Sequence, residues 1–200
     1  MPTKTLFWIR HAHSLHNERQ EAKEEELLER FPGSTGGTTD ASKFPGYRDA
    51  RKEAMFEALN GDDVFDSPLT AEGTLQAEAL RPEAARLVES AGVEVALTSS
   101  LKRTARTAWT AFSGLVPVVA LDVLREVAGA FDCERRDTLS AQRAAFPEVD
   151  WSACSEEDTL WVQYYRDANK EAVGRGVEAL ELIMARPEQT LAVVSHGAFS

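Results

Sequence analysis

Four short apolar runs, each followed by polar residues, most strongly limit how this chain can fold. Three of them are Thr5–Ile9, Val93–Leu97 and Val116–Leu121, and the fourth begins at Leu191 and ends in His196-Gly197. Their length and their β-branched or aromatic residues predict buried strands. Strands that alternate with helical stretches form parallel sheets. We therefore predict an α/β fold of three layers, with helices on both sides of a central, mostly parallel sheet.

The stretches between these runs predict helices and one long loop. The helices are expected at Glu18–Arg30, Arg48–Leu59, from Thr70 onward, Leu101–Phe112 and Ser155–Arg186. Residues 31–47 contain two prolines and four glycines, which predicts a loop or flap. Pro82 should kink or divide the helix that begins after Thr70. In the last helix, the residues expected to face the core include Val173, Leu180, Ile183 and Met184.

Polar residues follow each predicted strand. Arg10-His11 follows the first strand, Glu126 the third and His196 ends the fourth. The second leads into a helix whose N-terminus is suited to bind an anion. Since ligands of open α/β sheets bind beyond the carboxyl ends of the strands, these residues are candidates for one site. Each also has a plainer interpretation: a solvated strand end, a surface Arg–Glu pair, or a structural histidine.

The segments Arg10–Asn17, Ser99–Thr107 and Leu69–Ala77 each resemble a motif of the histidine phosphatase superfamily, the phosphoglycerate-mutase-like proteins. Arg10-His11 and Asn17 match a motif that opens with Arg-His-Gly and ends in Asn, with Ala12 in place of the usual Gly. Ser99 to Thr107 resembles a Ser-x-Leu-x-Arg-x-x-x-Thr-Ala element, whose arginine is a second phosphate clamp. Arg103 occupies that position. The segment from Leu69 to Ala77 resembles Leu-Thr-x-x-Gly-x-x-Gln-Ala, which serves mainly to mark the register.

The second half of the chain resembles the plant-type phosphoglycerate-mutase-like proteins in particular. The resemblance rests on Leu124-Arg-Glu-x-x-Gly-x-x-x-Cys133-x-x-Arg136 and on Phe146-Pro-x-Val-Asp150. It implies a phosphoglycerate-mutase-like fold made of a single domain, residues 1–200, with cap segments at about 31–66 and 127–155. Such proteins continue into a further helix after the position of Gly197, so the resemblance also predicts that the sequence is truncated at its C-terminus.

The resemblance implies a phosphatase that hydrolyses a small phosphorylated metabolite through a phosphohistidine. No cofactor or metal is expected, because cationic side chains take the place of the metal ion. The implied catalytic residues are His11, the nucleophile, Glu126, which protonates the leaving oxygen, and His196. The implied substrate-binding residues, which hold the phosphoryl group, are Arg10, Asn17 and Arg103.

Three other functions remain open. A mutase would use the same nucleophile but return the phosphate to an isomeric hydroxyl. A pseudoenzyme would bind a phosphorylated ligand without turnover. A metallohydrolase is suggested because His11-Ala-His13-Ser-Leu-His16 resembles the His-x-His-x-Asp-His run of metallo-β-lactamase-like enzymes. Leu15 replaces the metal-binding Asp, and His196 is the one histidine outside the run, so two metal ions would lack ligands.

Phosphatase is favoured over mutase because a mutase for a carboxylated phosphoester needs further cations for its carboxylate and its second phosphate position. The candidate cations for these two roles are Arg19, Lys43, Arg48, Arg135 and Arg136. Acidic neighbours such as Glu18, Asp49 and Glu134 offset much of their charge.

Composition limits the partners and the compartment. The formal net charge is −11, so neither nucleic acid nor an anionic membrane is expected as a partner. Cys133 and Cys154 form no Cys-x-x-Cys motif and are expected to be free thiols. Met1 to Lys4 lead directly into the first strand without room for a targeting peptide, which predicts a cytoplasmic protein. The oligomeric state is not indicated.

Overall fold

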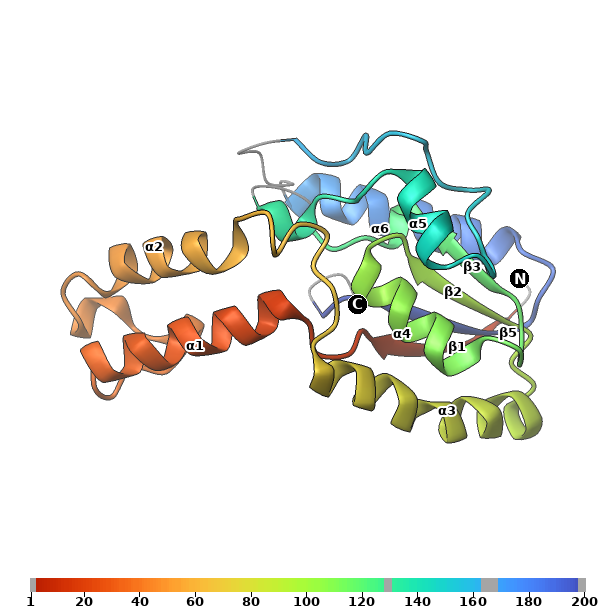
Figure 1. Ribbon diagram of the computed structural model, residues 1–200, viewed down its shortest axis with the longest axis horizontal. Coiled ribbons are helices and arrows are strands. Elements are labelled where there is room, and N and C mark those ends of the chain that lie inside the picture. The colour runs from red at the N-terminus through yellow and green to blue at the C-terminus, as the bar shows by residue number, and fades with distance from the viewer. Residues whose placement is uncertain (1–2, 128–130, 163–168, 198–200) are drawn as a thin grey trace.

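A computed structural model describes residues 3–127, 131–162 and 169–197 of the chain (Figure 1). Its strands are β1 (Thr5–Arg10), β2 (Val95–Ser99), β3 (Val118–Leu121), β4 (Val149–Asp150) and β5 (Thr190–Ser195). Its α-helices are α1 (Leu15–Arg30), α2 (Tyr47–Leu59), α3 (Ala71–Ala91), α4 (Lys102–Phe112), α5 (Leu139–Ala145) and α6 (Asn169–Ala185).

The strands form one sheet of order β1-β5-β2-β3-β4 in which every pair is parallel. Figure 1 shows α3 and α4 on one face and α6 on the other. Both faces are covered, so β2 is buried along its whole length and β5 from its second residue, and both strands appear in the sequence as largely apolar runs. The predicted α/β fold with a parallel sheet between helices is confirmed.

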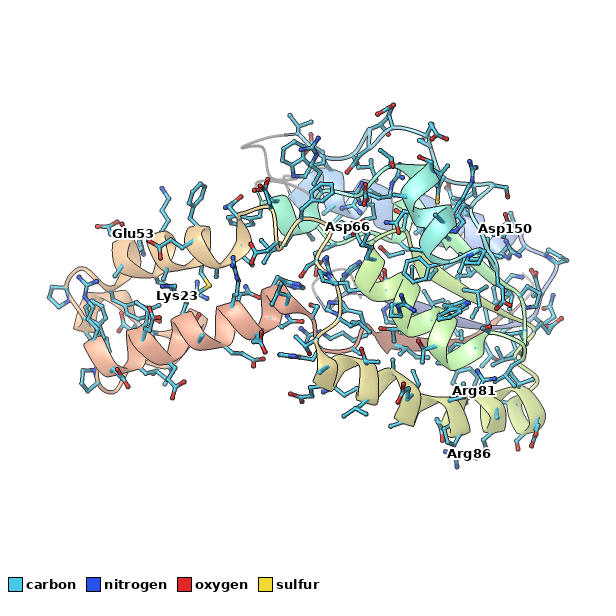
Figure 2. All side chains as sticks on the ribbon, in the orientation of Figure 1. Lys23, Glu53, Asp66, Arg81, Arg86 and Asp150 are labelled. Atoms are coloured by element: carbon cyan, nitrogen blue, oxygen red, sulfur yellow. The ribbon has the colours of Figure 1, made fainter. Side chains whose placement is uncertain are left out.

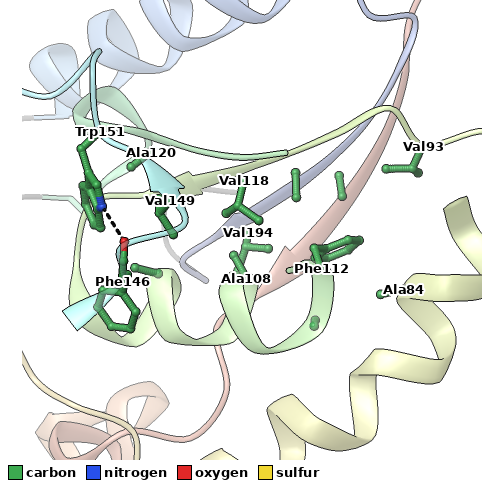
Figure 3. Packing of buried hydrophobic residues seen from close by; sticks show 14 of the residues in the cluster. Ala84, Val93, Ala108, Phe112, Val118, Ala120, Phe146, Val149, Trp151 and Val194 are labelled. Atoms are coloured by element: carbon green, nitrogen blue, oxygen red, sulfur yellow. Dashed lines mark hydrogen bonds between the residues drawn. The ribbon is translucent and has the colours of Figure 1, made fainter. Parts of the chain in front are cut away.

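Two separate cores hold the layers together. Between the sheet and α4, Phe112 and Ala108 pack against Val118 and Val194, while α3 contributes Ala84 (Figure 3). On the opposite face, strand residues pack against Ala179 and Ile183 of α6 together with other buried aliphatic side chains. Each core removes one full face of the sheet from water, which is the main driving force for this arrangement.

Several boundaries differ from those predicted. Two short elements, β4 and α5, were not foreseen, because a strand of two residues carries no periodicity. Pro82 does not divide α3, which is one helix from Ala71 to Ala91. The loss of one backbone hydrogen bond is tolerated there, since buried Ala77 and Ala84 anchor the helix on both sides of the proline.

The last predicted helix does not begin at Ser155, and its described part, α6, runs from Asn169 to Ala185. Residues 155–162 are not helical, because the carboxylate of Asp158 accepts hydrogen bonds from the backbone N–H groups of Leu160 and Trp161, both at 3.1 Å. Such local side-chain bonds compete with a helix. The core assignment was also partly wrong. Ile183 is buried, whereas Val173, Leu180 and Met184 are 66%, 51% and 41% exposed.

Helices α1 and α2 form a hairpin that projects from the carboxyl-end edge of the sheet (Figure 1). Its own small core contains Leu27, Tyr47 and Ala50, with Phe31 and Phe44 packed against them. The loop predicted at 31–47 contains two 3-10 turns and ends one residue earlier, because Tyr47 begins α2. The Tyr47 hydroxyl donates to the carbonyl of Gly36 at 2.7 Å. Within the described residues, no helix is long and apolar enough to span a bilayer.

Candidate active site

The carboxyl ends of β1, β5 and β2 bring polar residues from three distant parts of the chain together. Arg10 ends β1 and pairs in register with Ser195 of the neighbouring β5. His196 follows β5, and Ser99 ends β2 on its other side. The Ser99 hydroxyl lies 2.9 Å from Nε2 of His196. The edge of the sheet expected to hold the site therefore does gather these side chains.

A cavity of about 680 Å³ opens at this edge. Five of the six predicted residues line it, namely Arg10, His11, Asn17, Arg103 and Glu126. His196 is fully buried behind them, with its ring centroid 5.1 Å from that of His11. The structure therefore brings all six together, five on the cavity wall and one beneath it.

His11 is held in a form suited to nucleophilic attack. Its Nδ1 lies 2.8 Å from the carbonyl oxygen of Ala12, which can only accept, so Nδ1 carries the proton and Nε2 is left with a lone pair. Burial, together with the positive charge of Arg103, lowers the pKa of His11 to about 3. The ring is therefore neutral at physiological pH.

Arg103 places a permanent charge on the cavity wall. Its side chain is 1% exposed, and Nη1 donates to the carbonyl oxygen of Cys133 at 2.8 Å. Burial lowers its pKa, but an arginine remains protonated in proteins. One turn later, the Thr107 hydroxyl accepts a hydrogen bond from the N–H of Ala12 at 3.1 Å. Helix α4 thus supplies the cation and also fixes the loop that carries His11.

Sequence reasoning missed the role of the segment that begins α3. The backbone of this segment pairs with the His11 loop through a bridge between Ser14 and Leu69. Gln76 Oε1 accepts from the N–H of His13 at 2.8 Å. A Cβ atom on Gly73 would lie 1.8 Å from the carbonyl oxygen of His13, so only glycine fits. This segment therefore holds the loop that carries His11 in place, in addition to marking the register of the sequence.

His16 is a further residue that the analysis of the sequence left without a role. Asn17 Oδ1 accepts from both the N–H and the hydroxyl of Ser14, at 3.2 and 2.7 Å. The Ser14 oxygen must then accept from Nδ1 of His16, 2.7 Å away. Nε2 of His16 is consequently an acceptor, 3.3 Å from the Asn17 amide nitrogen. One indication in the sequence that His16 belongs to the site is its position next to Asn17. Both side chains line the same cavity.

Glu126 is positioned by an arginine from the far layer. Its Oε1 accepts from the N–H of Val127 at 3.0 Å. Arg175 of α6 is buried and donates to the carbonyl oxygens of Arg125 and Glu126 at 2.6 and 3.0 Å. No sequence motif marked Arg175. A second carboxylate, that of Glu134, also lines the cavity.

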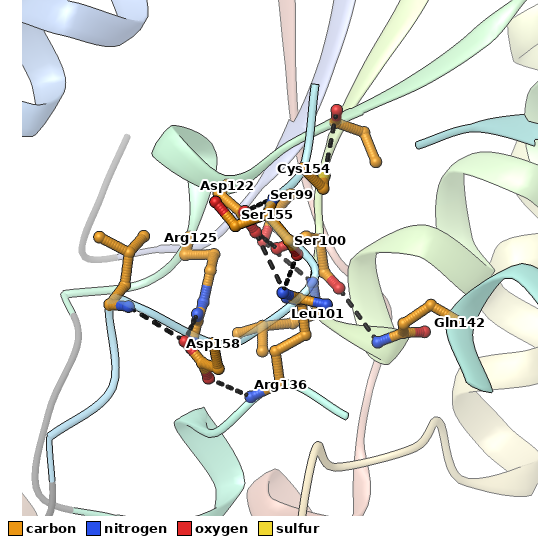
Figure 4. A network of polar contacts seen from close by, with 12 residues as sticks. Ser99, Ser100, Leu101, Asp122, Arg125, Arg136, Gln142, Cys154, Ser155 and Asp158 are labelled. Carbon is orange, nitrogen blue, oxygen red and sulfur yellow. Dashed lines mark hydrogen bonds and ion pairs between the residues drawn. The ribbon is translucent and has the colours of Figure 1, made fainter. Parts of the chain in front are cut away.

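Buried ion pairs hold the segment that follows Glu126 (Figure 4). Arg125 pairs with Asp158 and also donates to the carbonyl oxygen of Glu134. Arg136 lies 3.4 Å from Asp122 and donates to the carbonyl of Ser155. Removing one partner of such a pair would leave a buried charge without compensation. These contacts therefore fix residues 133–136 above the cavity and, with them, the carbonyl that holds Arg103.

The N-terminus of α4 is not the open anion site that was expected. Asp66, which lies between the hairpin and α4, accepts from the N–H of Lys102 at 2.8 Å (Figure 2). Its other oxygen accepts from the N–H of Asp137 at 2.8 Å and from Gln142 Nε2 at 2.6 Å. A protein carboxylate therefore occupies the position that a bound anion would take.

Arg106 and His13 are near the site in sequence, but their side chains contact residues outside the cavity. Arg106 lies over the rings of Trp109 and Phe146, in a separate groove of about 720 Å³. His13 Nδ1 lies 2.9 Å from the Thr70 hydroxyl. Among the residues that the structure describes, no three His, Cys, Asp or Glu side chains are arranged to hold a metal ion.

Stability should fall when the buried histidines are titrated. Burial lowers the pKa values of His11, His16 and His196 below the unfolded value of 6.5. Below pH 6.5 the unfolded chain therefore binds protons that the folded protein excludes. We expect the free energy of unfolding to be flat above pH 7 and to decrease from pH 6.5 to 5. The slope should approach about 1.4 kcal/mol per pH unit for each histidine.

Urea titrations at pH 7.5, 6 and 5 measure this effect, and the fall should be smaller in His16→Gln, which removes one of the three titrating groups. Unchanged stability between pH 7.5 and 5 would contradict the assignment of neutral, buried imidazoles.

The chain is similar to known proteins, both in its sequence and in its fold. A family profile described as the histidine phosphatase superfamily (branch 1) matches residues 61–200, a range that includes Arg103, Glu126 and His196. A phosphoglycerate mutase-like protein of Arabidopsis thaliana is 30% identical over 186 residues, covering 77% of this chain and 68% of that protein.

Two solved structures share the fold. Mycobacterial hydrolase 1 superposes with a TM-score of 0.51 at 16% identity, covering 98% of this chain and 75% of the other. Bacillus stearothermophilus YhfR superposes with a TM-score of 0.50 at 20% identity, covering 97% and 74%.

Proposed function

Because the chain belongs to branch 1 of the histidine phosphatase superfamily, we propose that it hydrolyses a small phosphomonoester through a phosphohistidine on His11. The observation that carries the proposal is the state of His11. Its ring is neutral, its proton is held on Nδ1 by Ala12, and it lies on the wall of a cavity shared with Arg10 and Arg103. A neutral imidazole between two guanidinium groups is suited to attack a phosphate dianion.

In the first step, Nε2 of His11 forms a bond to phosphorus while the bond from phosphorus to the alcohol oxygen breaks. Arg10, Arg103 and the Asn17 amide hold the three other oxygens and their charge. The imidazole becomes cationic, and the Ala12 carbonyl that binds Nδ1–H stabilises that charge. His196 completes the phosphoryl site from beneath, next to the His11 ring.

Glu126 handles the proton in both steps. It donates its proton to the departing alcohol oxygen, and the carboxylate then takes a proton from the water that attacks the phosphohistidine. The nitrogen–phosphorus bond breaks, which restores neutral His11 and releases inorganic phosphate. The hydrogen bonds from Arg175 keep the Glu126 backbone beside the cavity during this exchange.

A mutase reaction is the second candidate. Of the five candidate cations, Arg48 forms no ion pair with the described residues, and Arg135 lies over the rings of Phe65 and Trp161. The other three are offset, although not by the acidic neighbours named from the sequence: Arg19 pairs with Asp63, Lys43 with Asp40 and Arg136 with Asp122. This supports the choice of a phosphatase. A pseudoenzyme is disfavoured because all six residues needed for turnover are present and grouped. The cytoplasmic location stays a prediction.

The fate of the phosphoryl group separates the two enzymes. We expect rapid-quench experiments with ³²P-labelled glycerate and sugar phosphates to trap an acid-labile phosphoprotein. Its label should then appear as inorganic phosphate without priming by bisphosphoglycerate, because the residues around His11 hold one phosphoryl group and the cavity gives water access to it. Label recovered mainly in an isomeric phosphoester would instead establish a mutase, with His11 still the nucleophile.

A further inference from the structure

A second cavity, of about 660 Å³, continues the active-site cavity along the α1–α2 hairpin. The two cavities share Arg51, Met55 and Phe131 in their walls, so together they form one groove. The far part of this groove is lined by α2 and by the loop at 37–40. A substrate consisting of little more than its phosphate would leave this part empty.

Two cations from α2 line the far part of the groove without a protein partner. Arg48 and Lys52 lie one helical turn apart and are exposed. Neither side chain forms an ion pair or hydrogen bond with any residue that the structure describes. The other cations of the hairpin differ, since Lys23 pairs with Glu26 and Glu57, and Arg51 with Glu24.

Acidic groups near the groove do not neutralise this pair. Asp40 lines the same wall, but its carboxylate accepts from the N–H and the hydroxyl of Ser42, at 3.1 and 2.6 Å, and lies 3.8 Å from Lys43. Two like charges one helical turn apart repel each other slightly, and an anion bound between them would offset that repulsion.

We infer that the alcohol part of the substrate carries a second anionic group, which binds Arg48 and Lys52, an inference that rests on the proposed function. The part between the two anions lies against Met55 and Phe131, where the cavities join. Arg48 is seven residues from Met55, about 10 Å along the helix axis. The substrate is therefore longer than a three-carbon phosphoglycerate.

The test uses ω-functionalised alkyl phosphates of two to ten carbons that end in a carboxylate, a phosphate or an uncharged amide, with 4-nitrophenyl phosphate as reference. The double variant Arg48→Gln/Lys52→Gln is compared with Arg30→Gln/Arg86→Gln, which removes the same charge at exposed positions outside the groove. Comparing the carboxylate with the phosphate series identifies which anion the site prefers.

We expect the wild-type protein to prefer long anionic substrates to the matching amides by tenfold or more in kcat/KM. The groove variant should lose this preference through KM, while the control variant keeps it and 4-nitrophenyl phosphate is unaffected in both. Equal kcat/KM for anionic and amide substrates in the wild type, or the same losses in both variants, would overturn the inference while leaving the phosphatase intact.

Failure of the proposed function gives a different result, because no substrate would then be hydrolysed. In that case calorimetric titration with the corresponding alkyl phosphonates, ending in carboxylate or amide, decides the inference. Binding of the carboxylate that is weakened tenfold or more in the groove variant supports it, and equal binding of both phosphonates contradicts it.

Discussion

Replacing His11 with alanine is expected to abolish hydrolysis of 4-nitrophenyl phosphate. Among the described residues, His11 and His16 are the histidines that line the cavity. Nε2 of His16 lies beside the Asn17 amide nitrogen, which donates to it, so the available Nε2 lone pair is that of His11. Removal of a nucleophile in a preorganised site lowers kcat by roughly 10⁴–10⁶-fold. Steady-state kinetics measure this loss, and EDTA should leave the wild-type rate unchanged.

His13→Ala is the matched control, because His13 lies in the same loop but contacts Thr70 and Glu21 instead of the cavity. Its activity should stay within a few-fold of wild type. A phosphoprotein should be trapped from wild type and from His13→Ala, and not from His11→Ala. Substantial activity in His11→Ala, or loss of wild-type activity with EDTA, would refute the phosphohistidine mechanism.

Glu126→Gln is expected to act selectively on substrates with poor leaving groups. An alkoxide must be protonated as it departs, whereas 4-nitrophenolate departs without a proton. General acid catalysis contributes about 10²–10⁴-fold, so alkyl phosphates should slow by that factor while 4-nitrophenyl phosphate changes little in the phosphorylation step. Single-turnover rates of alcohol release across a series of leaving groups measure this difference.

Glu134→Gln serves as the control, because Glu134 lines the same cavity and has the same kind of side chain. It should slow both substrate classes to the same small extent. If Glu134→Gln instead shows the leaving-group dependence, Glu134 is the acid. If Glu126→Gln slows both classes equally, Glu126 is not the general acid.

The sequence alone predicted the fold class and the grouping of the site. Short β-branched runs that alternate with helical stretches predict a parallel sheet, and residues after the strands must then meet at one edge. Arg10, His11, Glu126 and His196 follow from this rule, and the resemblance to a known family added Asn17 and Arg103. The structure has the predicted fold and groups these side chains at one edge, because strand and helix periodicity is local and the geometry of a parallel sheet is general; their roles stay predictions.

Only the tertiary structure could assign the supporting contacts. Gly73 is required by a loop sixty residues earlier in the chain, and Arg175 holds Glu126 from the opposite layer. Asp66 fills the helix terminus that the sequence left open for a ligand, and Asp158 prevents a helix that composition favours. Each effect depends on which side chain reaches which backbone group across the fold. The order of residues along the chain does not give the distances between groups that are far apart in the sequence. The proton position on His11 is likewise set by one carbonyl oxygen 2.8 Å away.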